Sequence, residues 1–188
     1  MIVLGIDPGT IQMGFGVIRS EDDRVSYVDC GVLKASSSMP LEKRIHKLYL
    51  ELKKIVAEYE PDVVAVEKPF VAKNVQAAMA IGQAQAVAIL AASEQSVPVF
   101  QYLPTKIKGA IANYGASGKE QVKQMVWLQL GMKPPVFSGR KSNVVRPDLS
   151  GDADFAGASS PSDPTDALAV AICHSYEARL ARILERTR

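Results

Sequence analysis

The opening residues carry the feature that most limits how this chain can fold: an uninterrupted apolar run that ends on a carboxylate. Residues 2–6 are apolar or small without alternation, which is typical of a parallel-sheet strand covered on both faces. Asp7, Pro8 and Gly9 follow directly, and this triplet favours a turn because proline fixes one φ and glycine tolerates a positive one. The pattern predicts a central strand with Asp7 held at its carboxyl end. A turn-opening role alone is the alternative for this aspartate.

A second short apolar strand, predicted over 62–67, also finishes on an acid, Glu67. The elements expected between the two strand ends are a strand over 13–18, a strand over 24–33 and an amphipathic helix over 40–59. A crossover helix makes the strands that it joins parallel and neighbouring, so Asp7 and Glu67 should emerge at the same edge of the sheet. An exposed acid paired with Lys68 is the alternative for Glu67.

The remaining pattern completes an α/β fold with a five-stranded mixed sheet flanked by helices. The further elements expected are a helix over 74–93, a strand over 97–102, a short helix over 104–113, a helix from Ser117, capped by a Ser117/Glu120 box, to about Leu130, and a last helix from Asp163 to about Glu185. Residues 132–161 lack periodicity and are rich in Pro, Ser, Gly and Asp, which predicts an irregular, poorly ordered loop. A length of 188 residues fits one domain, over 1–188.

The helix over 74–93 is apolar or small on nearly all sides, and between its terminal Asn74 and Ser93 the polar exceptions are three glutamines. A helix without a polar face needs burial on two sides. One side can be the sheet and the other a second copy of the chain, which predicts a homodimer. A central helix enclosed within one chain also satisfies the pattern.

Two further acids, Asp163 and Asp166, begin the last helix on either side of Pro164. Capping alone explains both, because acids and proline are common at helix starts. Residues three apart nevertheless lie on one helix face, so both carboxylates would project toward Asp7 if the helix begins beside that strand end. Carboxylate oxygens without His or Cys ligands suit Mg²⁺ or Mn²⁺. Two such ions would relieve the electrostatic repulsion among the four acids. A pair of these ions could also promote the hydrolysis of a phosphodiester bond.

Positive charge is concentrated in residues 103–146, although the net charge of the chain is only +2. This basic segment has Glu120 as its one acid, and its basic residues are Lys106, Lys108, Lys119, Lys123, Lys133, Arg140, Lys141 and Arg146. A basic segment on a slightly acidic body suggests a polyanion held on one face. A solvated surface that contacts nothing is the alternative.

Other side chains give no sign of a different chemistry. Cys30 and Cys173 lack metal-type spacing and are expected to be reduced core thiols, and His46 and His174 are expected to be structural. No apolar stretch approaches about eighteen residues, and no signal-type run opens the chain, so we expect a cytoplasmic protein without membrane contact.

Six motifs in order resemble the RuvC-type Holliday junction resolvases, which have a ribonuclease H-like fold. They are GIDPG at 5–9, VE at 66–67 followed by FVAKN at 70–74, GQAQAV at 82–87, KIK at 106–108, GKEQV at 118–122 and DPTDALAVA at 163–171. The resemblance implies a magnesium-dependent nuclease, with Mn²⁺ as a substitute, that makes paired nicks in a four-way DNA junction. It places the catalytic, metal-binding tetrad on Asp7, Glu67, Asp163 and Asp166.

The resemblance also implies contacts to DNA and to partners. The family's DNA-contacting lysines fall on Lys108 and Lys119, and the wider expected set adds Lys73, Lys106 and Lys123. Phe70 matches an aromatic wedge against unpaired bases, with a hydrophobic plug as its alternative. The resemblance implies a homodimer with one site in each subunit. A branch-migration helicase complex is a further expected partner. Residues 135–161 exceed the family's usual link and are either a DNA-touching arm, through Arg140, Lys141 and Arg146, or a disordered insertion.

Three other functions remain open at this stage. A related ribonuclease H-like nuclease acting on RNA or other branched DNA would need the same metal site. An actin-like ATPase or a sugar kinase would share the first motif but needs a second lobe and another phosphate loop, which this chain lacks. A junction-binding protein without nuclease activity would keep the basic segment and use the acids only structurally.

Overall fold

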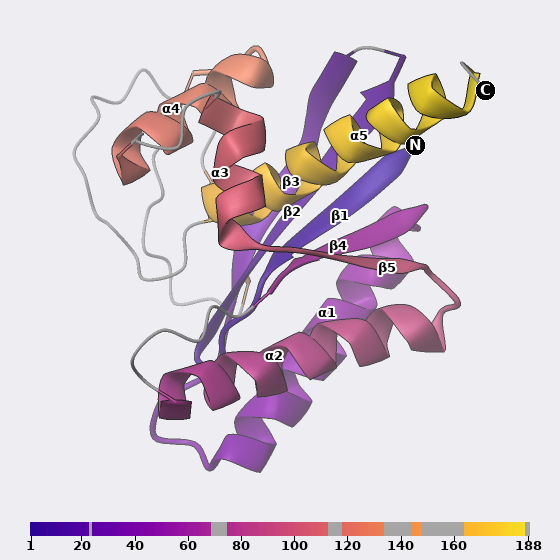
Figure 1. Cartoon of the computed structure of the whole chain (residues 1–188). Coiled ribbons are helices and arrows are strands. Elements are labelled where there is room, and N and C mark those ends of the chain that lie inside the picture. The colour runs from indigo at the N-terminus through magenta and orange to yellow at the C-terminus, as the bar shows by residue number, and fades with distance from the viewer. Residues whose placement is uncertain (23, 69–74, 113–117, 134–143, 148–163, 187–188) are drawn as a thin grey trace.

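The computed structural model of the chain describes residues 1–22, 24–68, 75–112, 118–133, 144–147 and 164–186 (Figure 1). The strands are β1 (Ile2–Asp7), β2 (Gln12–Glu21), β3 (Arg24–Lys34), β4 (Val63–Glu67), β5 (Val99–Tyr102) and β6 (Val144–Val145). The helices are α1 (Leu41–Tyr59), α2 (Val75–Glu94), α3 (Pro104–Ala112), α4 (Lys119–Gln129) and α5 (Pro164–Arg186).

Within the described residues the strands form one mixed sheet in the order β5-β4-β1-β2-β3-β6. β1 pairs in parallel with β4, and β4 with β5, whereas β2 and β3 make an antiparallel meander beside β1. The prediction of five strands is one short. The sixth strand, β6, pairs with β3 inside the stretch expected to be irregular, and two residues are too few for an alternating pattern to reveal a strand.

Both faces of the sheet are covered, which explains why the first strand is apolar without alternation. Helices α1 and α2 lie on one face, and α3, α4 and α5 lie on the other (Figure 1). Successive side chains of β1 alternate between the two cores: Leu4 and Ile6 pack in the core that includes α1 and α2, while Val3 packs in the core that includes α5. A polar residue within this strand would therefore be buried on either face.

Helix α5 crosses β1 and β2 at two glycines. A Cβ added to Gly5 would lie 2.1 Å from the carbonyl oxygen of Ala167, and one added to Gly16 would lie 2.7 Å from the backbone nitrogen of Leu168. Gly5 and Gly16 pair with each other across β1 and β2, so together they form one gap in the sheet surface that admits the helix backbone. This glycine notch holds the first turn of α5 against the strand that ends at Asp7.

The start of α4 differs from its prediction. Its N-cap is Gly118, which makes no side-chain capping hydrogen bond, and Ser117 lies outside the described residues. Its end agrees with the prediction, because Gly131 follows with a φ of 69°, the left-handed conformation that commonly terminates a helix. Cys30 and Cys173 are buried free thiols, as expected. No helix in the described ranges is both long and apolar enough to cross a bilayer.

Candidate active site

The carboxyl ends of β1 and β4 lie side by side at one edge of the sheet. Their parallel register pairs Ile6 with Val66, so Asp7 and Glu67 each stand one position beyond that pair. Glu67 pairs in turn with Tyr102 of β5. Carboxyl edges of parallel strands are where open α/β sheets carry their sites.

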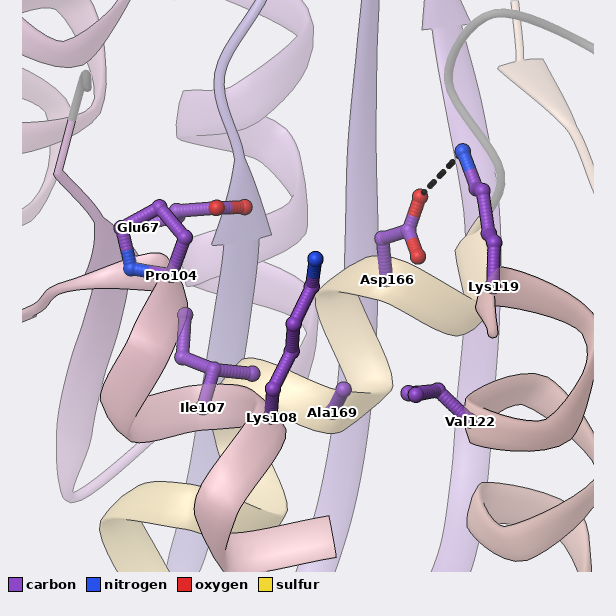
Figure 2. Close-up of a pocket in the computed structure, with 8 residues that line it drawn as sticks. All are labelled: Glu67, Pro104, Ile107, Lys108, Lys119, Val122, Asp166 and Ala169. Carbon is purple, nitrogen blue, oxygen red and sulfur yellow. Dashed lines mark ion pairs between the residues drawn. The ribbon is translucent and has the colours of Figure 1, made fainter. Parts of the chain in front are cut away.

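Glu67 and Asp166 line one cavity of about 240 Å³ (Figure 2). Its lining residues come from β4, α3, α4 and α5 and are Glu67, Pro104, Ile107, Lys108, Lys119, Val122, Asp166 and Ala169. Figure 2 shows the Lys108 side chain extending into the space between the two acids. Two carboxylates and two ammonium groups thus meet over an apolar floor, although their residues are far apart in the chain.

Asp166 occupies the first turn of α5, where the positive end of the helix dipole favours a carboxylate. Its Oδ2 lies 3.3 Å from Nζ of Lys119 on α4. The Asp166 side chain is 27% exposed and that of Lys119 is 58% exposed. The lysine therefore keeps contact with water while it neutralises part of the charge in the cavity.

Burial and, to a smaller extent, the negative charge of Asp166 raise the pKa of Glu67 to about 7, against the opposing charges of Lys108 and Lys119. A carboxyl group with this pKa is only partly ionised at neutral pH. The two lysines therefore do not compensate fully for desolvation and for the neighbouring acid. An additional cation beside Glu67 would hold it ionised.

The incomplete compensation of the Glu67 charge by the two lysines agrees with a divalent cation bound at this site. Hard carboxylate oxygens are the ligands that Mg²⁺ and Mn²⁺ prefer, and the residues expected to hold the ion are Asp7, Glu67, Asp163 and Asp166. Asp163 lies outside the described residues. The part of the chain that is described contains no three acidic, His or Cys side chains gathered closely enough to bind a metal ion by themselves.

The lysines expected to contact DNA fall into two groups. Lys108 and Lys119 line the cavity beside the acids. Lys106 is ion-paired with Glu177 of α5, and the Lys123 side chain, only 11% exposed, is paired with Glu120. Phe70 and Lys73 lie outside the described residues.

Two features of the structure around the site were not inferred from the sequence. The glycine notch could have been predicted, because a glycine inside a strand commonly indicates the close approach of another backbone segment. A buried hydrogen bond of 2.8 Å between Tyr102 and His174 had none, since the two residues come from distant elements. His174 was expected to be structural, and it is indeed buried.

Arg146 follows β6 and was considered as part of a DNA-touching arm. Its Nε lies 2.7 Å from Oδ2 of Asp29, and its guanidinium also pairs with Glu58. This arginine therefore ties the residues after β6 to β3 and α1. Arg140 and Lys141 lie outside the described residues.

Comparison with protein families gives a match over most of the chain. The family described as crossover junction endodeoxyribonuclease RuvC matches residues 3–136. A RuvC from Chloroflexus aggregans is 40% identical over 178 residues, which are 95% of this chain and 94% of that protein. A RuvC from Dehalococcoides mccartyi is 39% identical over 183 residues, 97% of each chain.

Solved structures agree. Thermus thermophilus RuvC in complex with a Holliday junction substrate superposes with a TM-score of 0.78 at 30% identity, covering 96% of both chains. The yeast mitochondrial Holliday junction resolvase Ydc2 has a TM-score of 0.65 at 13% identity, covering 96% of this chain and 80% of that one, and this likeness concerns the fold alone. The fold is therefore the ribonuclease H-like fold of these resolvases.

Proposed function

The chain belongs to the RuvC family of crossover junction endodeoxyribonucleases, and from this membership we propose that it is a Holliday junction resolvase. Its reaction is the hydrolysis of DNA phosphodiester bonds by paired symmetric nicks in a four-way junction, in recombination and repair. One RuvC relative of known structure is bound to a Holliday junction substrate, which supports the choice of this substrate over other branched DNA.

One observation from the structure carries the proposal. Glu67 and Asp166 line the same cavity as Lys108 and Lys119. Carboxylates able to bind a metal cation therefore lie beside lysine side chains able to bind a phosphate. A purely structural use of the acids would not require a cavity open to a ligand. Nor would it require a carboxyl group kept partly protonated by burial.

The metal proposed for this site is Mg²⁺, two ions per site, with Mn²⁺ able to substitute; the family is divalent-metal-dependent. When bound, the ions would supply Lewis acidity to the scissile phosphate and lower the pKa of the attacking water. Asp7, Glu67, Asp163 and Asp166 are assigned to hold them. Among the described acids, Asp7 and Glu67 would hold the ions from two neighbouring strand ends and Asp166 from the first turn of α5.

The lysines of the cavity are assigned to the DNA backbone. Lys108 and Lys119 would each neutralise a phosphate next to the cut, so binding should weaken steeply with salt as counterions are released. Phe70 and Lys73 are proposed as contacts to the unpaired bases and backbone near the crossover. Lys106 and Lys123 would contribute to the basic surface but would have to leave their acidic partners to contact DNA directly.

We also propose that two copies associate through α2. This helix buries Ala84 and Ala88 in the core, while Val75, Met79 and Leu90, spaced on one helix face, are 64%, 63% and 58% exposed. Burial of such exposed apolar side chains against a partner removes them from water and so stabilises the association. A two-fold dimer would present one site to each of two symmetry-related strands.

Two parts of the proposal rest on the activity rather than on contacts. A branch-migration helicase complex is the expected partner, because it would supply the junction at which the strands are cut. A cytoplasmic location is proposed because the substrate proposed for this protein is a DNA junction formed in recombination.

A cleavage assay tests the activity. Purified protein with Mg²⁺ or Mn²⁺ should cut a labelled synthetic four-way junction at paired positions, and should cut a fork, a linear duplex and an RNA–DNA hybrid much more slowly. Faster cutting of the fork or hybrid would instead favour a related nuclease of the same fold. No cutting of any substrate would leave only a binding protein.

Asp7→Asn distinguishes catalysis from binding. This variant should bind the junction with unchanged affinity while cleavage falls by at least about a thousandfold, because one metal-holding carboxylate is lost. Equal loss of binding and cleavage would mean that Asp7 is structural.

Met79→Glu tests the proposed dimer. Analytical ultracentrifugation should show a monomer for this variant, and the paired nicks in the junction should become single nicks.

A further inference from the structure

Tyr102 and His174 form a buried polar pair that the roles above do not use. The Tyr102 hydroxyl lies 2.8 Å from Nδ1 of His174, and the two residues are only 8% and 4% exposed. Neither residue lines the cavity. Burying a phenol and an imidazole is costly unless they satisfy each other, and two apolar side chains would fill the same space without that requirement.

The tyrosine end of the pair is attached to the strand that carries Glu67. Tyr102 is the last residue of β5 and pairs directly with Glu67 of β4. Its carbonyl oxygen accepts a hydrogen bond of 2.8 Å from the backbone N–H of Lys68. A displacement of Tyr102 would therefore be transmitted to the backbone on which Glu67 stands.

The histidine end is attached to the helix that carries Asp166. His174 follows Asp166 by two helical turns, about 12 Å along α5, and a continuous helix transmits its position to its own first turn. The Phe100 ring packs on the imidazole, with centroids 4.9 Å apart. One turn further along, Glu177 is ion-paired with Lys106 of α3, the helix that carries Lys108.

The protonation states of the pair follow from burial. Desolvation lowers the pKa of His174 in spite of the opposing charge of Glu177, and desolvation raises the pKa of Tyr102 to about 12. At neutral pH the phenol is therefore protonated and the imidazole is neutral. The phenol hydroxyl and Nδ1 therefore share one neutral hydrogen bond, and the histidine tautomer sets which of the two donates.

We propose that the Tyr102–His174 hydrogen bond is a positioning contact that sets the separation of Glu67 and Asp166, and through it the affinity of the site for divalent cations. Tyr102 and His174 are positioning residues and touch neither metal nor DNA. The inference rests on the proposed function for the identity of the cation and of the substrate.

The test removes one oxygen atom. In Tyr102→Phe, Mn²⁺ binding to the protein without DNA, followed by electron paramagnetic resonance, should weaken about three- to tenfold. For cleavage of the four-way junction with Mg²⁺, kcat should fall on the order of ten- to a hundredfold because Glu67 and Asp166 are misplaced. The KM for the junction should stay the same. His174→Leu should give the same pattern.

Tyr176→Phe is the matched control. Tyr176 lies on the same helix and donates a hydrogen bond of 3.2 Å to the Gln129 side chain of α4, so this variant also removes one hydroxyl contact of α5, but one that does not reach β5. We expect its Mn²⁺ affinity and kcat to equal those of the wild type. If it lost as much as Tyr102→Phe, or if Tyr102→Phe bound Mn²⁺ normally, the positioning role would be refuted.

The double variant separates positioning from general destabilisation. Because one hydrogen bond joins the pair, Tyr102→Phe with His174→Leu should lose little more kcat than either single variant. Multiplicative losses would mean independent structural effects and would overturn the proposal. Wild-type protein that binds Mn²⁺ but cuts no junction would refute the proposed function alone, since the positioning role is decided by the Mn²⁺ affinities.

Discussion

Gly5 of β1 and Ala167 of α5 are in backbone contact so close that a Cβ on the glycine would lie 2.1 Å from the alanine carbonyl oxygen. Gly5 stands two residues before Asp7, and Ala167 comes directly after Asp166. The contact therefore brings a strand end and a helix start, from opposite ends of the chain, to the same edge of the sheet. It depends on the absence of a side chain at residue 5.

Gly5→Ala should displace α5 or prevent it from packing. The added methyl group meets backbone atoms, which cannot rotate away, so we expect the free energy of unfolding to fall by about 2 to 4 kcal/mol. Urea unfolding measures this loss. Gly109→Ala in α3 is the control, because a Cβ there meets nothing within 4 Å; it should be neutral or stabilising by about 0.5 to 1 kcal/mol.

Glu67→Gln should stabilise the protein in the presence of a chelator at alkaline pH. The pKa of Glu67 is raised from 4.5 to about 7 in the folded state, so the folded protein binds this proton more tightly than the unfolded chain. The resulting stability is fully present below about pH 4.5 and is lost as the pH rises through 7. The glutamine avoids that loss, which is at most about 3.5 kcal/mol for a rise of about 2.5 pKa units at about 1.4 kcal/mol per unit.

Thermal unfolding at about pH 4.5 and pH 8 checks this pH dependence. The wild type and Glu67→Gln should unfold at similar temperatures at the lower pH and should separate at the higher one. Glu185→Gln, at the exposed end of α5, should follow the wild type at both. A constant difference between wild type and Glu67→Gln would contradict the raised pKa.

Lys108→Met should weaken junction binding and reduce its salt dependence. Loss of one phosphate contact lowers the slope of log K against log salt by about one unit. Fluorescence anisotropy between about 50 and 200 mM salt, with a chelator to prevent cutting, measures the slope. Lys54→Met on α1, across the sheet and 70% exposed, should leave the slope unchanged, whereas equal effects of the two variants would argue for diffuse attraction.

Arg146→Met should lower stability without changing junction affinity. The guanidinium is paired with the largely buried Asp29, to which Tyr59 also donates a hydrogen bond of 2.6 Å, so we expect a loss of about 1 kcal/mol in the free energy of unfolding. Arg19→Met, which breaks an exposed pair with Glu21, should cost less. Weakened junction binding by Arg146→Met at unchanged stability would restore the DNA-contact hypothesis for this arginine.

Local patterns were sufficient for most of the fold. Apolar runs that stop at Asp7 and Glu67 marked two parallel strands, and helical periodicity located the helices to within a few residues. The short β6 was missed because two residues carry no period. The N-cap of α4 was misplaced because a glycine and a serine are both acceptable at that position.

The sequence by itself determined the elements, the acids at two strand ends and the helix start, and the family to which the chain belongs. Only the tertiary structure decided that Lys106 and Lys123 are paired with acids, that burial raises the pKa of Glu67, and that Tyr102 meets His174. The physical reason is range: strands, turns and helices depend on neighbours a few residues away. Ion pairs, desolvation and backbone contacts such as that at Gly5 depend on which distant segments pack together.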